Sequence, residues 1–313
     1  MLHLRVIAPA ALTADVRELL VGEPGAAHVT VLSGAAVRPE GDVVEADVTR
    51  EAVDGVLAGL KGLGVDHVGG VTLEAIDTTL SDAAVAAEKA VPGDPADAVI
   101  WEELIERTGE DSRLSWSFQA FLTIACLLAA IGAVTNSPVT VVGAMVLGPE
   151  FGPLAAVAVG MVLRRGDLVR GGLLALVVGF PLAVLVTAAA AVLFSAVGLL
   201  TTADLDAGNQ VDFIYSVGWF SLIVALLAGA AGMLALTSAK SASLVGVFIS
   251  VTTVPAAGYA AVAAVEGRWA QMASSIGQLA VNLVGIVVAA VLVLLVARSP
   301  AGRGRGLGRA SAG

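Results

Sequence analysis

One acidic residue, Glu150, stands inside a strongly apolar span of the chain. It lies in the segment NSPVTVVGAMVLGPEFGP, residues 136–153, together with Pro149 and Pro153. A proline has no backbone N–H, so Pro149 and Pro153 leave the carbonyls of Met145 and Pro149 without their helical donors. In lipid, such carbonyls need neighbouring helices, water, an ion or a solute as partners. The segment therefore predicts a broken membrane helix with polar groups available for binding.

An ionised carboxylate at mid-bilayer costs at least about 2.5 kcal/mol, so Glu150 should be protonated, paired or in contact with an aqueous cavity. Lys240 offers only a distant ion pair. The alternative is that Glu150 lies near an interface or in a structural hydrogen bond, and that the other polar side chains only join helices. The polar side chains expected near Glu150, all from apolar spans or their ends, are Asn136, Thr252, Thr253, Gln278 and Asn282.

Small residues recur every fourth position around this acid. That spacing puts them on one helix face, where they permit close contact with another helix. If the helix were continuous, Glu150 would lie about 200° round the axis from Gly148, on the other side. The residues of this predicted packing face are Ala144, Gly148, Gly152, Ala156 and Gly160.

A weak internal repeat accompanies the broken helix. A shift of 102 residues superimposes the first three apolar spans on the last three and places Pro153 on Pro255. Because each copy has three spans, the second copy must cross the membrane in the opposite direction, as in many secondary transporters. In such folds the substrate site lies where interrupted helices meet, here 148–153 and 252–255. The other matches are Ala144 on Gly246, Gly148 on Ser250 and Ala156 on Gly258.

Six apolar runs are long enough to cross about 30 Å of hydrocarbon. Arginines cluster after the second run and in the tail 298–313, whereas the loop from Asp204 to Asp212 is acidic. The positive-inside rule therefore places both termini in the cytoplasm. We expect the tail to be disordered and the acidic loop to be solvated. The six runs are 117–134, 138–163, 170–199, 217–237, 243–264 and 275–297.

The composition separates two regions with different solvents. The whole chain is 57% hydrophobic and 14% charged, with a mean hydropathy of +0.90. Residues 1–116 hold 21 acids and 8 bases, a net charge of −13, whereas residues 117–313 hold 6 acids and 9 bases, a net charge of +3. The N-terminus has no signal-peptide pattern, which also favours a cytoplasmic first region. The single cysteine, Cys126, excludes an intrachain disulfide and is expected to be a small core residue.

The first region, residues 1–80, alternates in the order β-α-β-β-α-β, which predicts a ferredoxin-like α+β domain. Its first strand is the alternating run 2–9, and its last strand is expected over 67–76. Its second helix follows Thr49 and carries an apolar face of Val53, Val56, Leu57 and Leu60. Residues 81–116 are expected to form a linker and an amphipathic helix that begins at Asp94-Pro95, and this helix either couples the two domains or merely joins them. All three histidines, His3, His28 and His67, fall in the first region. The expected topology puts His3 and His67 at opposite ends of the sheet, so no metal site or cofactor is predicted.

The membrane region, 117–297, also resembles a known family. The resemblance rests on Ile131-Gly132, Asn136-Ser137-Pro138, the run 142–145 and the Gly-Pro pairs at 148 and 152. These segments are similar to bacterial membrane proteins grouped as the domain of unknown function family 389, over roughly residues 115–260. The resemblance implies a hydrophobic domain with several spans, often beside a soluble segment, and no established activity or catalytic residue. In that family the position of Glu150 is more often apolar.

Together these features predict a six-helix membrane protein of the bacterial cytoplasmic membrane that handles an ion or a small solute as a transporter or channel-like protein. The N-terminal domain would regulate it. The alternative is a membrane sensor or oligomerisation scaffold that transports nothing. No histidine, phosphate-binding loop or HExxH pair lies in the membrane region, so we expect no enzyme. The expected partners are lipid, an ion or small solute and further copies of the chain, and not nucleic acid.

Overall fold

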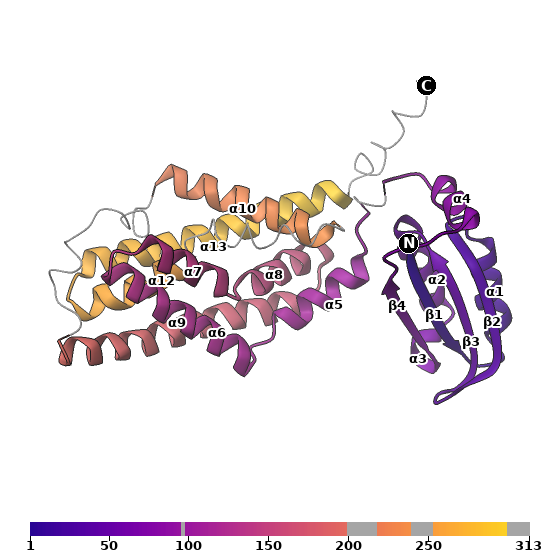
Figure 1. Ribbon diagram of the computed structural model, residues 1–313, viewed down its shortest axis with the longest axis horizontal. Helices are drawn as coiled ribbons and strands as arrows, with labels where there is room; N and C mark the ends of the chain where they lie inside the picture. Colours follow the sequence, from indigo (N-terminus) through magenta and orange to yellow (C-terminus); the bar gives the residue numbers. More distant parts are fainter. Residues whose placement is uncertain (95–97, 199–217, 239–252, 299–313) are drawn as a thin grey trace, which may run out of the picture. The chain divides into compact units, whose positions relative to one another are not determined.

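The computed structural model describes residues 1–94, 98–198, 218–238 and 253–298, and the chain divides into two compact units (Figure 1). Residues 1–103 build most of the first unit, and the second begins at Leu104. The division therefore falls within helix α5 (Trp101–Asp111) and not at residue 117. The reason is that the second half of α5 packs against membrane helices.

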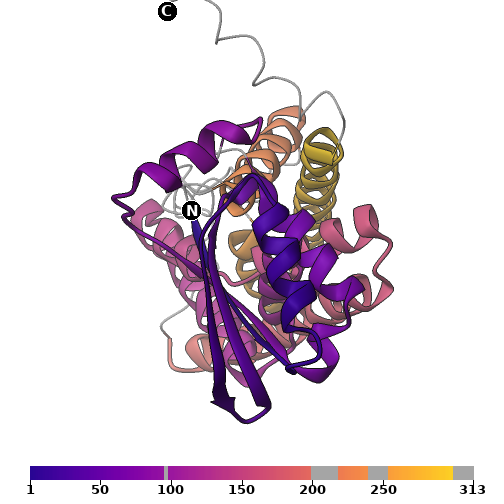
Figure 2. The same cartoon turned by 90° about the vertical axis from the view of Figure 1, so that its right-hand side faces the viewer.

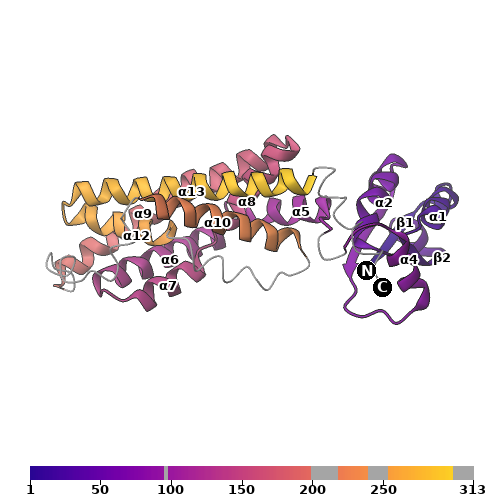
Figure 3. The same ribbon diagram turned by 90° about the horizontal axis from the view of Figure 1, so that it is seen from above.

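The first unit is an antiparallel four-stranded sheet with helices. Its strands lie in the order β2-β3-β1-β4 and run alongside one another in Figure 2. Helices α1 and α2 lie on one side of the sheet and α4 lies on the other (Figure 3). The elements are β1 (Leu2–Ala8), α1 (Thr13–Gly22), β2 (Ala26–Val37), β3 (Glu40–Val48), α2 (Arg50–Gly62), α3 (Val65–Val68), β4 (Gly70–Ala75) and α4 (Asp82–Ala90).

The alternation of apolar and polar residues along the strands explains how this unit forms a core. In β1, Leu2, Leu4 and Val6 are buried beneath the helices, while the residues between them face the other side of the sheet. Helix α2 begins directly after Thr49 and buries its predicted apolar face, which includes Val53. The predicted sequence of strands and helices is therefore present, and its apolar residues form one core.

Three local expectations were wrong. Residues 67–76 are not one strand, because the short helix α3 precedes β4. Residues 81–93 are not only a linker, because Ser81 accepts a hydrogen bond from the Ala84 N–H and caps α4. The helix expected to begin at Asp94-Pro95 is α5, which begins at Trp101. Residues 98–100 are not helical, and Pro95 lies outside the described residues.

The second unit is a bundle of apolar helices. Four of them are long and apolar enough to cross a membrane, and α7 with α8 forms a fifth such segment bent by 48°. Several such helices indicate a membrane protein. Six spans are not confirmed, because the 13-residue α12 is too short alone and residues 243–252 lie outside the described part. The helices are α6 (Trp116–Val134), α7 (Pro138–Leu147), α8 (Phe151–Leu163), α9 (Gly166–Ala196), α10 (Trp219–Thr237), α12 (Thr253–Val265) and α13 (Trp269–Arg298).

The helices of this bundle correspond in pairs. The bounds of α12 lie 102 residues after those of α8, and those of α10 lie 103 residues after those of α6. Likewise α13 begins 103 and ends 102 residues after α9. Helix α8 packs against α9 and α13, and α12 packs against the same two helices. Figures 1 and 3 draw α8 and α12 towards opposite ends of the bundle.

Candidate functional site

The expected break in the second apolar run is present between α7 and α8. Helix α7 ends at Leu147, Gly148 turns the chain into an extended conformation, and α8 begins at Phe151. The Met145 carbonyl is not left without a donor, because it accepts a hydrogen bond from the Gly148 N–H at 3.4 Å. The turn itself thus satisfies one of the two carbonyls that the prolines were expected to free.

Pro153 does not kink a helix, contrary to expectation. It is the third residue of α8, and Pro255 is the third residue of α12. In the first turn of a helix an N–H has no intrahelical acceptor, so a proline there costs no hydrogen bond. The two prolines therefore begin two short helices within the apolar region.

The Glu150 side chain lies where these two helices begin. Only 8% of the residue is exposed, and the Thr253 hydroxyl donates a hydrogen bond to its Oε1 atom. Thr253 is fully buried and is the first residue of α12. The other carboxyl oxygen of Glu150, Oε2, has no hydrogen-bond partner in the described part of the chain. Glu150 is therefore a buried carboxyl group with one satisfied oxygen.

The backbone of Gly148 touches this carboxylate. A Cβ atom on Gly148 would collide with Glu150 Oε2 and lie 2.8 Å from a methyl group of Val254. The prediction that Glu150 lies on the opposite side from Gly148 was therefore wrong, because the chain is not helical at residues 148–150. Glycine is needed here so that the carboxylate can fold back against the chain.

The α6 helix completes the surroundings. Cys126 lies on this helix and is fully buried. Helix α12 approaches α6 at Gly258, where an added Cβ would lie 2.6 Å from the Cys126 carbonyl oxygen. Gly258 therefore lets α12 pack tightly beside α6 and holds Thr253 near Glu150.

The small residues do not form one continuous packing face. The break separates Ala144 on α7 from Ala156 on α8, although both are fully buried. Gly152 faces Asp111 of α5, and Gly160 faces the start of α9, where an added Cβ would lie 2.8 Å from the Arg165 carbonyl oxygen. Each small residue thus admits a different neighbour, because the bend turns α8 away from the axis of α7.

Asn136 is not a companion of Glu150. It lies in the turn before α7, so the ten residues of that helix separate the two by about 15 Å. Its backbone is left-handed, with φ = 47°, and its Oδ1 atom is buried without a hydrogen-bond partner in the described residues. Thr252 and Lys240 lie outside the described residues.

Gln278 and Asn282 form a polar pair on α13. Gln278 Nε2 donates a hydrogen bond to Asn282 Oδ1 at 3.3 Å, and both side chains are buried. Ser275, one turn earlier, is also buried, and its hydroxyl has no partner among the described residues. Because α13 packs against α8, these amides form a polar strip along a neighbour of the broken span.

Helix α5 contacts the broken span directly. A Cβ on Gly152 would lie 2.6 Å from the Asp111 Cβ atom, and Gly171 of α9 approaches Ser112. Burial raises the pKa of Asp111, Arg107 opposes this shift, and the Glu110 charge adds to it. The end of α5 is therefore fitted against α8 two residues from Glu150, a contact that sequence periodicity could not identify.

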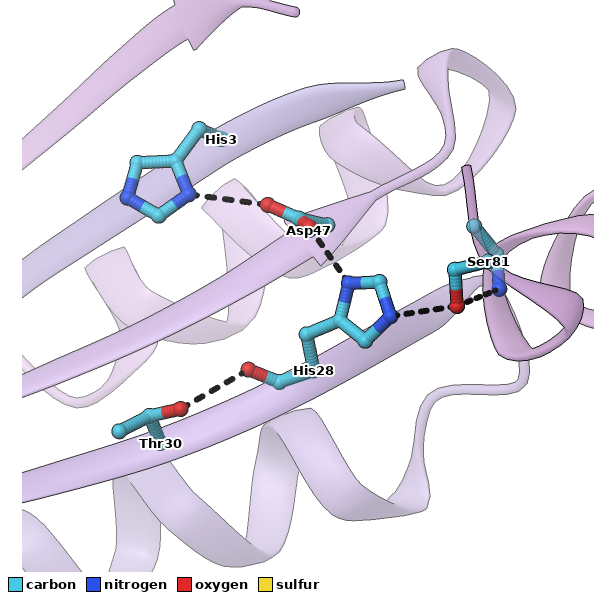
Figure 4. Close-up of polar contacts among 6 residues, drawn as sticks. His3, His28, Thr30, Asp47 and Ser81 are labelled. Carbon is cyan, nitrogen blue, oxygen red and sulfur yellow. Dashed lines mark hydrogen bonds and ion pairs between the residues drawn. The ribbon is translucent and has the colours of Figure 1, made fainter. Parts of the chain in front are cut away.

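A second polar cluster lies on the sheet of the first unit (Figure 4). Asp47 bonds two histidines: Oδ1 is 2.9 Å from His3 Nδ1, and Oδ2 is 2.6 Å from His28 Nδ1. His28 Nε2 lies 2.7 Å from the Ser81 hydroxyl, at the start of α4. Partial burial raises the pKa of Asp47, but the hydrogen bonds from His28 and His3 outweigh it and hold that pKa below its usual value.

This cluster joins four elements that are distant in sequence. Strand alternation could have placed His3 beside Asp47, because the two residues pair directly between β1 and β3. His28 could not have been placed, since it has a positive φ of 54° beside an irregular strand register. His67 precedes β4 at the other end of the sheet. In the described residues, no group of three His, Cys, Asp or Glu side chains is arranged to hold a metal ion.

The membrane unit was also compared with known proteins. Residues 145–288 match the family model described as Domain of unknown function (DUF389). This part of the membrane unit is therefore similar to the DUF389 family. The match confirms the family resemblance, but it covers different residues from those expected, so most of the segment 136–145 precedes the DUF389 region. Glu150 and Thr253 both lie within it. A search of curated proteins and a search of solved structures found no match.

Proposed function

We propose that this protein moves an ion or a small solute across the bacterial cytoplasmic membrane, along a path that includes Glu150 and Thr253. The observation that carries the proposal is the buried carboxylate at the junction of α8 and α12, with one oxygen left unpaired. A buried acid in an apolar bundle is costly, and such residues usually mark ion or solute pathways. Gln278 and Asn282 supply further polar groups along α13, and no enzymatic activity is proposed.

The spacing and packing of the helices in the membrane unit support this proposal. The paired bounds of α8 with α12 and of α9 with α13 repeat at an interval of about one hundred residues. Their packing is also reciprocal, since each short helix contacts the long helix of its own half and that of the other half. We infer six spans in a 3+3 arrangement, in which two half-helices meet at the substrate site.

The position of the arginines supports cytoplasmic termini. The Arg298 side chain, at the end of α13, donates a hydrogen bond to the Val162 carbonyl near the end of α8 at 2.9 Å. The ends of α8 and α13 therefore lie at the same end of the bundle, next to Arg164 and Arg165. A cluster of arginines at one end favours the cytoplasmic side.

The first unit would regulate the membrane unit. Its strand order and helices support a ferredoxin-like domain, a fold that often binds small ligands. Helix α5 follows this domain in the chain and packs at Asp111 against Gly152. A ligand or state sensed by the first unit could thus shift α5 and change the position of α8 beside Glu150.

A second candidate function is a non-transporting sensor or scaffold. The break between α7 and α8 favours this function because it exposes few polar groups. The Met145 carbonyl is satisfied within the turn, and Glu150 is almost fully buried. Apolar side chains such as Val177 and Leu185 of α9 are well exposed and would face lipid or another copy of the chain. A homo-oligomer fits either function.

Flux measurements separate the two. Purified full-length protein in phospholipid vesicles would be tested against a panel of inorganic ions and small metabolites, with Glu150→Gln as the variant. Asp167→Asn is the matched control, because it neutralises an exposed acid at the start of α9. Flux that changes in Glu150→Gln but not in Asp167→Asn supports transport. Absence of flux and binding across the panel would leave the scaffold function.

A further inference from the structure

Glu150 has no positively charged neighbour on the helices around it. Helices α6, α7, α8, α10 and α12 carry no charged side chain. The charged side chains of α9 lie in its first two turns, and that of α13 is its last residue, Arg298. Arg298 bonds to the Val162 carbonyl near the far end of α8, and this 13-residue helix places that end about 18 Å from Glu150. In the described residues, no basic group therefore balances the charge of the Glu150 carboxylate.

The two oxygens of this carboxylate differ. Oε1 accepts the Thr253 hydroxyl bond, whereas Oε2 is buried and accepts no bond in the described residues. The Gly148 backbone lies against Oε2, and Val254 lies on the same side. A buried oxygen of this kind accepts a donor or binds a cation, and the proton is the smallest cation. A proton on Oε2 removes the charge that is costly in an apolar region.

The same surroundings disfavour a metal cation. Helix α8 begins directly after Glu150, and a helix N-terminus carries about half a positive charge. A metal ion keeps its full charge beside this helix end and needs several oxygen ligands. A proton needs only the oxygen to which it is attached, and it leaves a neutral carboxyl group.

A second acid lies beside the first turn of α8, on helix α5. An added Cβ on Gly152 would lie 2.6 Å from the Asp111 Cβ atom, so Asp111 packs on the α8 backbone two residues after Glu150. Asp111 is exposed, and partial burial still raises the pKa of its carboxyl group, with Arg107 opposing the shift and Glu110 adding to it. An exposed carboxyl group of this kind can exchange protons with water.

We propose that the ion moved along the transport path is the proton, that Glu150 Oε2 binds it, and that Asp111 passes it between water and Glu150. This inference rests on the proposed transport function and names its ion. Water protonates Asp111, the proton passes to the Glu150 carboxylate, and its release on the other side of the membrane restores that carboxylate. Only O–H bonds form and break, and both carboxyl groups are unchanged after each cycle. The Thr253 hydroxyl holds the Glu150 carboxyl group through Oε1 throughout.

The other titratable groups of the membrane helices are few. Helix α6 contributes the buried Cys126 thiol, and α12 contributes the Tyr259 hydroxyl, which is already hydrogen-bonded. Asp167, at the start of α9, forms an ion pair with Arg165 at 2.7 Å. Helices α7, α8, α10 and α13 contribute no acid. Among the described residues, proton uptake inside the helix bundle therefore falls on Glu150.

The first test measures proton flux by the full-length protein in phospholipid vesicles that contain a pH-sensitive dye. Outward diffusion of potassium through valinomycin makes the interior negative and drives protons inward. The wild-type protein should acidify the interior, alone or with a member of the solute panel. Glu150→Gln should reduce acidification to the level of protein-free vesicles. Asp167→Asn is the matched control and should leave acidification unchanged.

Two variants of Asp111 test its part in the path. Asp111→Asn should slow acidification about tenfold or more, because it removes the group that exchanges protons with water. Asp111→Glu should restore most of the rate, since it keeps a carboxyl group. If Asp111 only packed on Gly152, the longer glutamate would disturb that contact more than asparagine and would restore nothing.

The second test detects the proton on Glu150 directly. The infrared band of neutral carboxyl groups is recorded in detergent between about pH 5.5 and pH 8, where exposed carboxyl groups are almost all ionised. In Asp111→Asn, a band should grow as the pH falls, and it should be absent when Glu150→Gln is added. If Glu150→Gln does not fold, Glu150→Asp keeps a carboxyl group and should shift the frequency of this band.

The outcomes separate this inference from the proposed function. Tracer flux of sodium or potassium, measured without valinomycin, that Glu150→Gln abolishes while the wild type gives no acidification would overturn the proton and keep transport. A Glu150 band that titrates without flux of any ion or solute would keep the proton on Glu150 and overturn transport. If acidification is equal in the wild type and Glu150→Gln and no band depends on Glu150, the inference is wrong.

Discussion

The hydrogen bond between Thr253 and Glu150 leads to a prediction about stability. Thr253→Val replaces the hydroxyl with a methyl group of similar size, so packing is conserved and the Glu150 Oε1 atom loses its donor. Because Oε2 has no partner in the described residues, the carboxylate would keep no side-chain donor there. The variant should therefore unfold more easily than the wild-type protein.

The expected loss is about 1–2 kcal/mol. Hydrogen bonds to charged groups contribute about 1.5–3 kcal/mol in soluble proteins. Measured values for interhelical bonds in membranes are lower, about 0.6 kcal/mol on average and at most about 1.7. Because Thr253 is fully buried and Glu150 almost fully, this bond lies at the upper end of that range.

The assay is reversible unfolding of the purified protein in mixed micelles, with Thr187→Val as control. That substitution removes a buried hydroxyl without a partner in the described residues, so it should not lower the free energy of unfolding. In the Glu150→Gln background, Thr253→Val should cost less than in the wild type, because the remaining acceptor is uncharged. Equal losses in Thr253→Val and Thr187→Val would refute the importance of the bond.

Three further predictions concern other contacts. Asp47→Asn should increase hydrogen exchange in β3 and α4 at neutral pH. Since the folded pKa of Asp47 is lowered, the difference from the wild type should begin to shrink below about pH 4 and should vanish only below the folded pKa. His67→Gln, outside the cluster, should show no such change. Asp111→Asn should raise the thermal stability at neutral pH but not below about pH 4, because a raised folded pKa costs stability as the carboxyl ionises. Gly152→Ala should lower the free energy of unfolding by about 1–3 kcal/mol through its clash with Asp111, whereas Gly143→Ala, with open space around it, should not destabilise the protein.

Local patterns in the sequence predicted much of the fold. The alternation of Leu2, Leu4 and Val6 and the apolar face of α2 follow from the periods of strand and helix, and both are buried as predicted. The lengths of apolar runs likewise predicted α6, α9, α10 and α13. These features depend on near neighbours in the chain, so sequence spacing is sufficient to locate them.

The sequence determined that an acid lies in an interrupted apolar span, and it predicted a counterpart of that span about one hundred residues later. Only the tertiary structure decided that Glu150 turns back onto Gly148 and bonds to Thr253, that Asn136 lies far away, and that Asp111 packs on the broken span. The reason is that a helix period predicts direction only while the chain stays helical. At residues 148–150 the backbone leaves the helix, so contacts made by other helices set the position of the carboxylate.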